Sequence, residues 1–224
     1  MKSKPFVRGL TTKLKKKKGR KLSSTTWLSR QLNDPYVREA GVRGYKSRAA
    51  FKLIEMDDRF QFLRQGLRVV DLGAAPGGWT QVALERVGTN GKVISLDKQE
   101  EWDGVPGAVC IKMDFTFDSA IEELLKASNG TVDIVLSDMA ASSTGHAKTD
   151  HLRIMGLAEH AWDFASQILS PKGVFICKVL QGGAEDTLLK EIKKSFVNVK
   201  HVKPPSSRKD SSEMYLFAEG FKKL

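Results

Sequence analysis

Short runs of β-branched and other apolar residues alternate with helical patterns from residue 67 to residue 196. The runs have the length and composition of buried strands, and they read LRVVDL, GKVISLD, AVCIKMD, VDIVLSD and GVFICKV. Helical patterns occupy residues 78–87, 117–128 and 151–169. Because strands that alternate with helices pair in parallel, this pattern predicts an α/β fold with helices on both faces of a parallel sheet.

The end of the chain departs from this alternation. A helical pattern over residues 185–196 precedes two more strand-like runs, VNVKHVK and SEMYLFAEG, which are separated only by a short loop that contains Pro-Pro-Ser-Ser. Two strands joined by a short loop without a helix pair antiparallel. The predicted sheet is therefore seven-stranded and mostly parallel, with one antiparallel strand near an edge.

Two helical segments are predicted ahead of the first strand. The first lies within residues 23–41, starts at a Ser/Thr-rich cap and is interrupted by Pro35. The second covers residues 45–60, with Ser47 as its candidate N-cap. We therefore predict two regions, a basic tail over residues 1–22 and one folded domain over residues 23–224.

The positive charge of the chain is concentrated in this tail. The net charge is +11, and residues 1–22 hold ten Lys and Arg residues and no acid, which leaves +1 for residues 23–224. Such a tail is either a solvated arm or a segment that binds RNA by releasing counterions from its phosphates, and we predict the second. No apolar run approaches the roughly 18 residues that cross a bilayer, and the two cysteines define no disulfide framework. These features predict a cytoplasmic protein without a membrane segment.

The first strand runs into a glycine-rich turn, VVDLGAAPGGWTQ. Glycines at 73, 77 and 78 do not have the G-x-G-x-x-G spacing of a dinucleotide-binding turn. Gly73 and Gly77 keep side chains away from a close-packed ligand, and Pro76 is expected where the following helix begins. A tight turn that serves packing alone is the alternative interpretation.

Acidic residues follow or end the first four predicted strands, at Asp71, Asp97, Asp114 and Asp138. The carboxyl ends of parallel strands form the ligand-binding edge of such a sheet. An acid at the distance of Asp97 from the glycine turn commonly binds a ribose diol, and Asp114 is placed to accept a hydrogen bond from an adenine amino group. Carboxylates repel phosphates and attract a sulfonium, so the set favours S-adenosylmethionine over NAD or ATP.

Two lysines interrupt apolar patterns. Lys178 lies within a run that otherwise has the composition of a buried strand, and Lys52 lies within an apolar helix. A buried ammonium needs a partner or a function. The strand directions place Asp138, Lys178 and the start of the last strand, Glu213, at the same edge, with Lys52 as a fourth candidate from the preceding helix. We expect Lys52 to lower the pKa of Lys178, which then acts as a base or orients a hydroxyl group.

Five segments carry a specific resemblance. They are GYKSRAAFKL, VVDLGAAPGGWTQ, VLSDMA, ICKVLQGG and KPPSSRKDSSEMY. Together they resemble the FtsJ-type ribose 2′-O-methyltransferases, the heat-shock ribosomal RNA methyltransferase family, over about residues 24–221. The resemblance implies a Rossmann-like methyltransferase fold, S-adenosylmethionine as cofactor, and a ribose 2′-hydroxyl of RNA as methyl acceptor, most of all a uridine in 23S-type large-subunit ribosomal RNA.

The resemblance also implies the roles of individual residues. The catalytic set comprises Lys52, Asp138, Lys178 and Glu213, and the cofactor-binding set comprises Gly77, Trp79, Asp97, Asp114 and Asp138, to which the glycine turn adds Gly73. Trp79 is expected to lie near the cofactor. Ala141 departs from the family pattern, which has proline there, so the loop after the fourth strand is expected to differ in shape.

Further expectations concern partners. The partner is ribosomal RNA or the large ribosomal subunit, the protein is a monomer, and no metal is bound because the histidines lack ligand spacing. The predicted phosphate contacts are the tail, Arg43, Lys46, Arg48, residues 206–209 and His201.

Three other functions remain open at this stage. One is an RNA-binding ribosome-assembly factor with a non-catalytic cofactor pocket, which would not need Lys178. Another is an NAD-dependent oxidoreductase, which would share the sheet and Asp97 but needs the missing glycine spacing. The third is a methyltransferase that acts on a base or a protein, which would not need the four ionisable residues.

Overall fold

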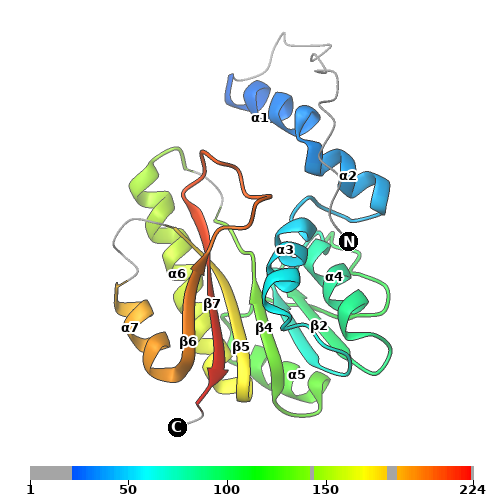
Figure 1. Cartoon of the computed structure of the whole chain (residues 1–224), viewed down its shortest axis with the longest axis vertical. Coiled ribbons are helices and arrows are strands. Elements are labelled where there is room, and N and C mark those ends of the chain that lie inside the picture. Colours follow the sequence, from blue (N-terminus) through cyan, green and yellow to red (C-terminus); the bar gives the residue numbers. More distant parts are fainter. Residues whose placement is uncertain (1–21, 142–143, 181–185, 223–224) are drawn as a thin grey trace.

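A seven-stranded sheet forms the centre of the protein, as Figure 1 shows for the computed structural model, which describes residues 22–141, 144–180 and 186–222. The strands are β1 (Arg68–Leu72), β2 (Lys92–Asp97), β3 (Val109–Lys112), β4 (Val132–Ser137), β5 (Leu169–Leu180), β6 (Phe196–Val202) and β7 (Glu213–Phe221). Their order across the sheet is β3-β2-β1-β4-β5-β7-β6. Only β7 runs antiparallel to its neighbours, β5 and β6, so the predicted mostly parallel sheet with one antiparallel strand is confirmed.

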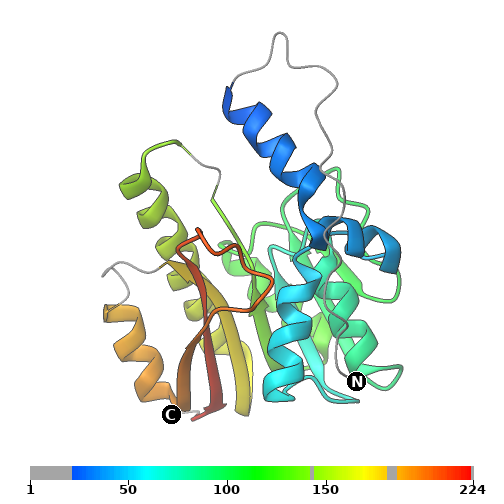
Figure 2. The ribbon, with the colours of Figure 1, turned by 45° about the horizontal axis from the view of Figure 1, so that its top comes forward.

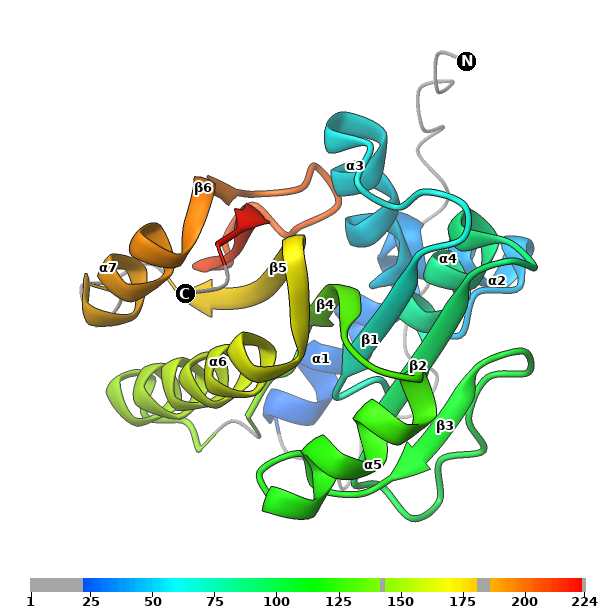
Figure 3. The ribbon, with the colours of Figure 1, turned by 90° about the horizontal axis from the view of Figure 1, so that it is seen from below.

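Helices cover both faces of the sheet. The helices of the described residues are α1 (Leu22–Asn33), α2 (Pro35–Arg43), α3 (Ala50–Phe60), α4 (Gly78–Val87), α5 (Asp118–Ser128), α6 (Ala147–Ile168) and α7 (Asp186–Ser195), and the last five cover the sheet. Helices α5, α6 and α7 lie on one face and α3 and α4 on the other (Figure 3). The central strands β1 and β4 are buried along nearly their whole length because both faces are covered.

Helices α1 and α2 lie beyond the carboxyl ends of the parallel strands (Figure 2). Pro35, which was expected to interrupt one helix, instead starts a second one: it occupies the first turn of α2, where its missing N–H costs nothing. The Asp34 side chain caps this helix by accepting a hydrogen bond from the backbone N–H of Tyr36 at 3.0 Å.

The start of α3 differs from the prediction. The helix begins at Ala50, its N-cap is Ala49, and no side chain caps it, so the expectation for Ser47 was wrong. The Ser47 hydroxyl packs against Gly78 instead, where a Cβ would lie 2.3 Å from Oγ. Ser47 therefore contributes to the close packing of the segment before α3 against the start of α4.

Among the described residues, no helix is both long enough and apolar enough to cross a membrane. Within the same ranges, no group of three or more His, Cys, Asp or Glu side chains is arranged to hold a metal ion. The predicted basic tail lies outside the described residues, apart from Leu22.

Candidate active site

Four ionisable side chains from four separate elements meet at the carboxyl edge of the sheet. Asp138 directly follows β4, Lys178 lies near the end of β5, Glu213 starts the antiparallel β7, and Lys52 comes from α3. Residues alternate between the faces of a strand, and Val174, Ile176 and Lys178 share the face that α3 covers. The structure thus brings together all four members of the predicted catalytic set.

Asp138 is the centre of this cluster. Its Oδ1 atom lies 2.7 Å from Lys178 Nζ and 3.5 Å from Lys52 Nζ. Lys178 Nζ also donates to the backbone carbonyl of Asp138 at 2.9 Å. Glu213 is held more loosely, with its carboxylate oxygens 3.7 Å from Lys52 Nζ and 3.9 Å from Lys178 Nζ. Two nearly buried ammonium groups therefore share two carboxylates.

The charges in the cluster stabilise one another. Burial alone raises the pKa of Asp138, but Lys178 and Lys52 outweigh it and bring the pKa below its ordinary value. Burial lowers the pKa of Lys178, but Asp138 and Glu213 outweigh it and bring the pKa above its ordinary value. The expectation that Lys52 lowers the pKa of Lys178 was therefore wrong, because the two carboxylates dominate the electrostatics at Lys178. In the free protein Lys178 is an ammonium.

Tyr215 is a member of the cluster that the sequence interpretation missed. Its hydroxyl accepts a hydrogen bond from Lys52 Nζ at 2.8 Å and donates one to Asp138 Oδ1 at 2.5 Å. The residue lies directly opposite Lys178 in the pairing of β5 with β7. A signal was present in the sequence, since Tyr215 follows Glu213 by two residues and shares its strand face.

The glycine-rich turn after β1 owes its glycines to backbone conformation and packing. Gly73 has φ +69°, and a Cβ there would lie 2.2 Å from Cγ of Met139. Gly77 has φ +112°, and its Cβ would lie 2.3 Å from Cγ2 of Val105. Pro76 does not start α4: it follows a cis peptide bond, and Gly77 is the N-cap of the helix. The glycines are therefore required by the packing of the turn, and the approach of a cofactor to its backbone stays a prediction.

Asp97, at the end of β2, joins two turns at the same edge. Its Oδ2 accepts a hydrogen bond from Ala75 N at 2.9 Å, and its Oδ1 accepts one from Gln99 N at 2.9 Å. Each carboxylate oxygen has a second lone pair, so Asp97 retains the capacity to bind the two hydroxyls of a ribose.

Asp114 follows β3 and stabilises its own turn. Its Oδ1 accepts hydrogen bonds from the backbone N–H and the hydroxyl of Thr116, and Oδ2 lies 3.3 Å from Lys98 Nζ. Partial burial raises the pKa of Asp114, but the hydrogen bonds from Thr116 outweigh it and lower the pKa. The carboxylate is therefore charged at neutral pH and can accept from a ligand amino group.

Asp71 and Trp79 lie behind the edge rather than on it. Burial raises the pKa of Asp71 to about 7, and its Oδ2 accepts a hydrogen bond from Thr80 Oγ1 at 2.7 Å. Trp79 is buried, and its indole N–H donates to the backbone carbonyl of Ala49 at 2.8 Å. Its ring lies 5.5 Å from the ring of Tyr215. Trp79 joins α4 to α3 and supports the cluster from behind, so its contact with a cofactor stays a prediction.

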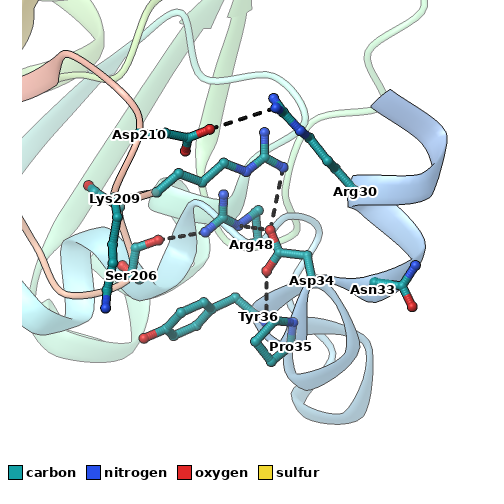
Figure 4. A pocket seen from close by; sticks show the side chains of 11 residues that line it. Arg30, Asn33, Asp34, Pro35, Tyr36, Arg48, Ser206, Lys209 and Asp210 are labelled. Carbon is teal, nitrogen blue, oxygen red and sulfur yellow. Dashed lines mark hydrogen bonds and ion pairs between the residues drawn. The ribbon is translucent and has the colours of Figure 1, made fainter. Parts of the chain in front are cut away.

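A groove leads from α1 and α2 to this cluster. One pocket of about 430 Å³ lies between the α1–α2 junction and the β6–β7 loop (Figure 4), lined by Arg30, Asn33, Asp34, Pro35, Tyr36, Arg48, Ser206, Ser207, Arg208, Lys209 and Asp210. A second, of about 260 Å³, shares Arg30, Arg48, Arg208 and Asp210 with it and reaches Lys52 and Glu213. The four shared residues show that the two pockets adjoin each other, and we refer to them together as the groove.

Ion pairs and hydrogen bonds hold the walls of this groove together. Asp34 lies 3.1 Å from Nε of Arg48 and 3.4 Å from NH2 of Arg208. Arg48 donates to the backbone carbonyl of Ser206 at 2.5 Å, and Glu55 accepts from both the N–H and the hydroxyl of Ser206. The β6–β7 loop is therefore fixed to α2 and α3.

The predicted phosphate contacts divide into two groups. Arg48 and residues 206–209 line the groove together with Arg30, which the sequence interpretation missed. Lys46, by contrast, donates to the backbone carbonyl of Gly104, and Arg43 pairs with Glu39, and neither lines the two pockets. His201 lies on the edge strand β6.

Comparison with known proteins shows similarity to one family. The family model described as FtsJ-like methyltransferase matches residues 45–221. "Ribosomal RNA large subunit methyltransferase E" of Paramagnetospirillum magneticum is 58% identical over 220 residues, covering 96% of this chain and 90% of that protein. The protein of the same name from Rhodospirillum rubrum is 57% identical over 221 residues, covering 97% and 84% of the two chains.

Solved structures show the same relationship. A protein from Plasmodium falciparum described as a ribosomal RNA methyltransferase superimposes with a TM-score of 0.71 at 32% identity, covering 79% of this chain and 98% of that chain. An S-adenosylmethionine-dependent O-methyltransferase from Thermotoga maritima has a TM-score of 0.53 at 15% identity, covering 76% and 66% of the chains, and supports the fold alone.

Proposed function

The chain belongs to the FtsJ-like methyltransferase family, and we propose that it transfers the methyl group of S-adenosylmethionine to a ribose 2′-hydroxyl of large-subunit ribosomal RNA, at a uridine. The observation that carries the proposal is the cluster of Lys52, Asp138, Lys178 and Glu213 at the end of a groove lined by arginines. The arginines can donate hydrogen bonds to phosphate oxygens. The cluster can both donate a hydrogen bond to a hydroxyl group and accept one from it.

The residues at the carboxyl edge fit S-adenosylmethionine. Asp97 has free lone pairs for the ribose, and Asp114 is a charged acceptor after the neighbouring strand. Asp138 places Oδ1 toward Lys178 and Tyr215, and its Oδ2 has no partner among the described residues. When bound, S-adenosylmethionine supplies an activated methyl group on a positively charged sulfur, a charge that these carboxylates favour.

The chain itself has to align the hydroxyl group and remove its proton. Lys178, as an ammonium held by Asp138, donates a hydrogen bond through Nζ and fixes the ribose 2′-oxygen. Glu213 has the weakest contacts of the four and a partly exposed side chain, so its carboxylate is available to accept the proton of the hydroxyl. Lys52 keeps the total charge of the cluster balanced. Aligned transfer of this kind requires no covalent intermediate on the protein.

The arginine-lined groove is proposed to hold RNA on either side of the target nucleotide. Arg30, Arg48, Arg208 and Lys209 offer the donors that phosphate oxygens accept. A ribose 2′-hydroxyl is absent from DNA, so a site built around this group selects RNA. The corresponding partner is ribosomal RNA, free or within the large subunit. Since ribosomes are assembled there, we place the protein in the cytoplasm, and we propose that it acts as a monomer.

The alternative functions find no support in the comparisons. An NAD-dependent oxidoreductase requires a glycine spacing that the turn after β1 lacks. A non-catalytic assembly factor would gain nothing from two nearly buried lysines, whose charges are costly to desolvate.

Replacing Asp97 by alanine is expected to raise the Kd for S-adenosylmethionine by about ten- to a hundredfold, because charged hydrogen bonds to the ribose and to Ala75 N are both lost. Isothermal titration calorimetry measures the change. The control is Asp163→Ala on α6, an exposed carboxylate away from the sheet edge. An unchanged Kd for Asp97→Ala would remove Asp97 from the cofactor site.

Deleting residues 1–22 is expected to weaken RNA binding and to flatten its dependence on salt, because ten basic residues are lost. Filter binding or fluorescence anisotropy at several salt concentrations gives the slope of log K against log salt. An equal slope for the full and the shortened chains would leave the tail without a role in RNA binding.

The proposed function is tested by incubating the protein with labelled S-adenosylmethionine and two substrates, naked large-subunit ribosomal RNA and large subunits that lack the modification. We expect label in the RNA of at least one substrate and none in the ribosomal proteins. Label confined to protein, or no transfer to either substrate with cofactor bound, would contradict the proposal.

A further inference from the structure

We propose that Tyr215 is a positioning residue for methyl transfer, whose hydroxyl separates Lys52 from Asp138 and holds both side chains in their working positions. This inference rests on the proposed function and adds a fifth residue to its catalytic cluster. Tyr215 is fully buried, with a relative exposure of 0%. It therefore acts on the reaction through its neighbours.

The hydrogen bonds around the hydroxyl of Tyr215 have only one possible direction. An ammonium donates and cannot accept, so Lys52 Nζ donates to the hydroxyl oxygen at 2.8 Å. The single hydroxyl proton is then left for Asp138 Oδ1, at 2.5 Å. Because burial raises the pKa of Tyr215 well above 10, and the charge of Asp138 raises it further, this proton is retained at all relevant pH values.

This arrangement fixes the distances within the cluster. Lys178 Nζ lies 2.7 Å from Asp138 Oδ1, in direct contact, whereas Lys52 Nζ lies 3.5 Å from the same atom. The hydrogen bonds from Lys52 to the Tyr215 hydroxyl and from that hydroxyl to Asp138 are each shorter, at 2.8 Å and 2.5 Å, than the direct separation of Lys52 from Asp138. The hydroxyl of Tyr215 thereby prevents direct contact between Lys52 and Asp138. Lys178 keeps its own direct ion pair with Asp138, which aligns the Lys178 side chain.

The position of Tyr215 is itself well determined. It pairs with Lys178 across β5 and β7, so both side chains emerge on one face of the sheet. The ring of Trp79 packs beside it, and Lys52 Nζ lies 5.3 Å from the centre of the Tyr215 ring. A side chain locked in this way can hold Asp138 with little freedom of movement.

The test compares Tyr215→Phe with Tyr45→Phe. Tyr45 is a matched control because its hydroxyl also donates to a carboxylate, Glu85 Oε2 at 2.8 Å, but belongs to no part of the cluster. We expect Tyr215→Phe to lower kcat by about ten- to a hundredfold, the effect of losing a hydrogen bond to a charged group. The KM values for cofactor and RNA should stay within about twofold. Tyr45→Phe should change neither kcat nor KM.

A loss of stability alone would lower the amount of active protein, and hence the apparent kcat, without changing KM. The kcat of each variant is therefore calculated from its concentration of cofactor-binding sites, and thermal melting of both variants is measured alongside. If Tyr215→Phe does not fold, 4-aminophenylalanine at position 215 restores a donor at the same place and is expected to retain most of the kcat. A kcat within twofold of the unchanged protein for Tyr215→Phe, or equal losses for the two phenylalanine variants, would overturn the proposal.

A crystal structure of Tyr215→Phe tests the positioning without relying on activity. We expect Lys52 Nζ to move toward Asp138 Oδ1, to the roughly 2.8 Å of a direct charged hydrogen bond. An unchanged separation of 3.5 Å would contradict the inference. If the unchanged protein methylates no RNA, the proposed function fails, and this crystal structure alone decides the role of Tyr215.

Discussion

Replacing Lys178 by alanine is expected to lower kcat for methyl transfer by about 10³-fold, while the Kd for S-adenosylmethionine changes by less than about threefold. Removing one positioned donor to the oxygen on which charge develops typically costs about 10²- to 10³-fold in kcat. Lys178 Nζ is the group in direct contact with Asp138 at 2.7 Å, and its side chain is 6% exposed, so no water or neighbouring lysine takes its place easily. Single-turnover methyl transfer and calorimetric titration measure the two quantities.

Lys222→Ala serves as the control. Lys222 is an exposed lysine beyond the end of β7, and this substitution also removes one positive charge. It should leave both quantities unchanged. A kcat for Lys178→Ala within tenfold of the unchanged protein would remove Lys178 from the mechanism. A large loss of cofactor affinity would instead assign Lys178 to the cofactor site.

Replacing Asp138 by alanine is expected to abolish transfer and also to lower the free energy of unfolding by about 3 kcal/mol. Removing one partner from a buried ion pair leaves an uncompensated charge, which typically costs about 3–5 kcal/mol. Here Lys178 loses its partner at 2.7 Å and keeps only Glu213 at 3.9 Å, while Lys52 keeps Glu213 at 3.7 Å. Chemical denaturation at neutral pH measures the loss.

Asp58→Ala is the matched control for this stability measurement. Asp58 pairs with Arg86 at 2.8 Å, but its side chain is 60% exposed, so the pair contributes at most about 1 kcal/mol. Asp58→Ala should also leave methyl transfer unchanged. If Asp138→Ala were no less stable than Asp58→Ala, the buried cluster would not be held by the charge of Asp138.

The pattern of apolar residues was sufficient to predict the sheet. Strands such as VDIVLSD are buried on both faces and so are mostly apolar, and their alternation with helices determines that they are parallel. The antiparallel direction of β7 followed from the short loop before it. Strand direction alone then placed Asp138, Lys178 and Glu213 at one edge, as the structure has them.

Sequence reasoning missed how two helices start. Pro35 was recognised as a break, but whether a second helix follows depends on the cap that Asp34 provides. Ser47 has the residue type of an N-cap, yet its side chain packs against Gly78 and caps no helix. The Asp-Pro pair is a local signal for a helix start that sequence reasoning overlooked, whereas the packing of Ser47 against Gly78 cannot be deduced from the local pattern.

The prediction that the pKa of Lys178 is lowered was wrong because this pKa depends on the folded structure. The sequence suggested that another lysine would be close, but the pKa depends on which charges are closest, and these are Asp138 and Glu213. Tyr215 escaped notice because its position in an apolar strand is typical of a core residue. Its role depends on the hydroxyl group, whose partners only the folded chain brings within reach.

The central claim concerns one atom, the ribose 2′-oxygen, and it is tested most directly by locating the transferred methyl group. Labelled large-subunit RNA from the methylation reaction is hydrolysed in alkali, which requires a free 2′-hydroxyl to cleave the adjoining phosphodiester. We predict that the label remains in an alkali-stable dinucleotide and that digestion to nucleosides yields 2′-O-methyluridine. Label in a mononucleotide with a methylated base would contradict this prediction. The protein would then use S-adenosylmethionine, but Lys178 and its neighbours would not act on a ribose 2′-hydroxyl.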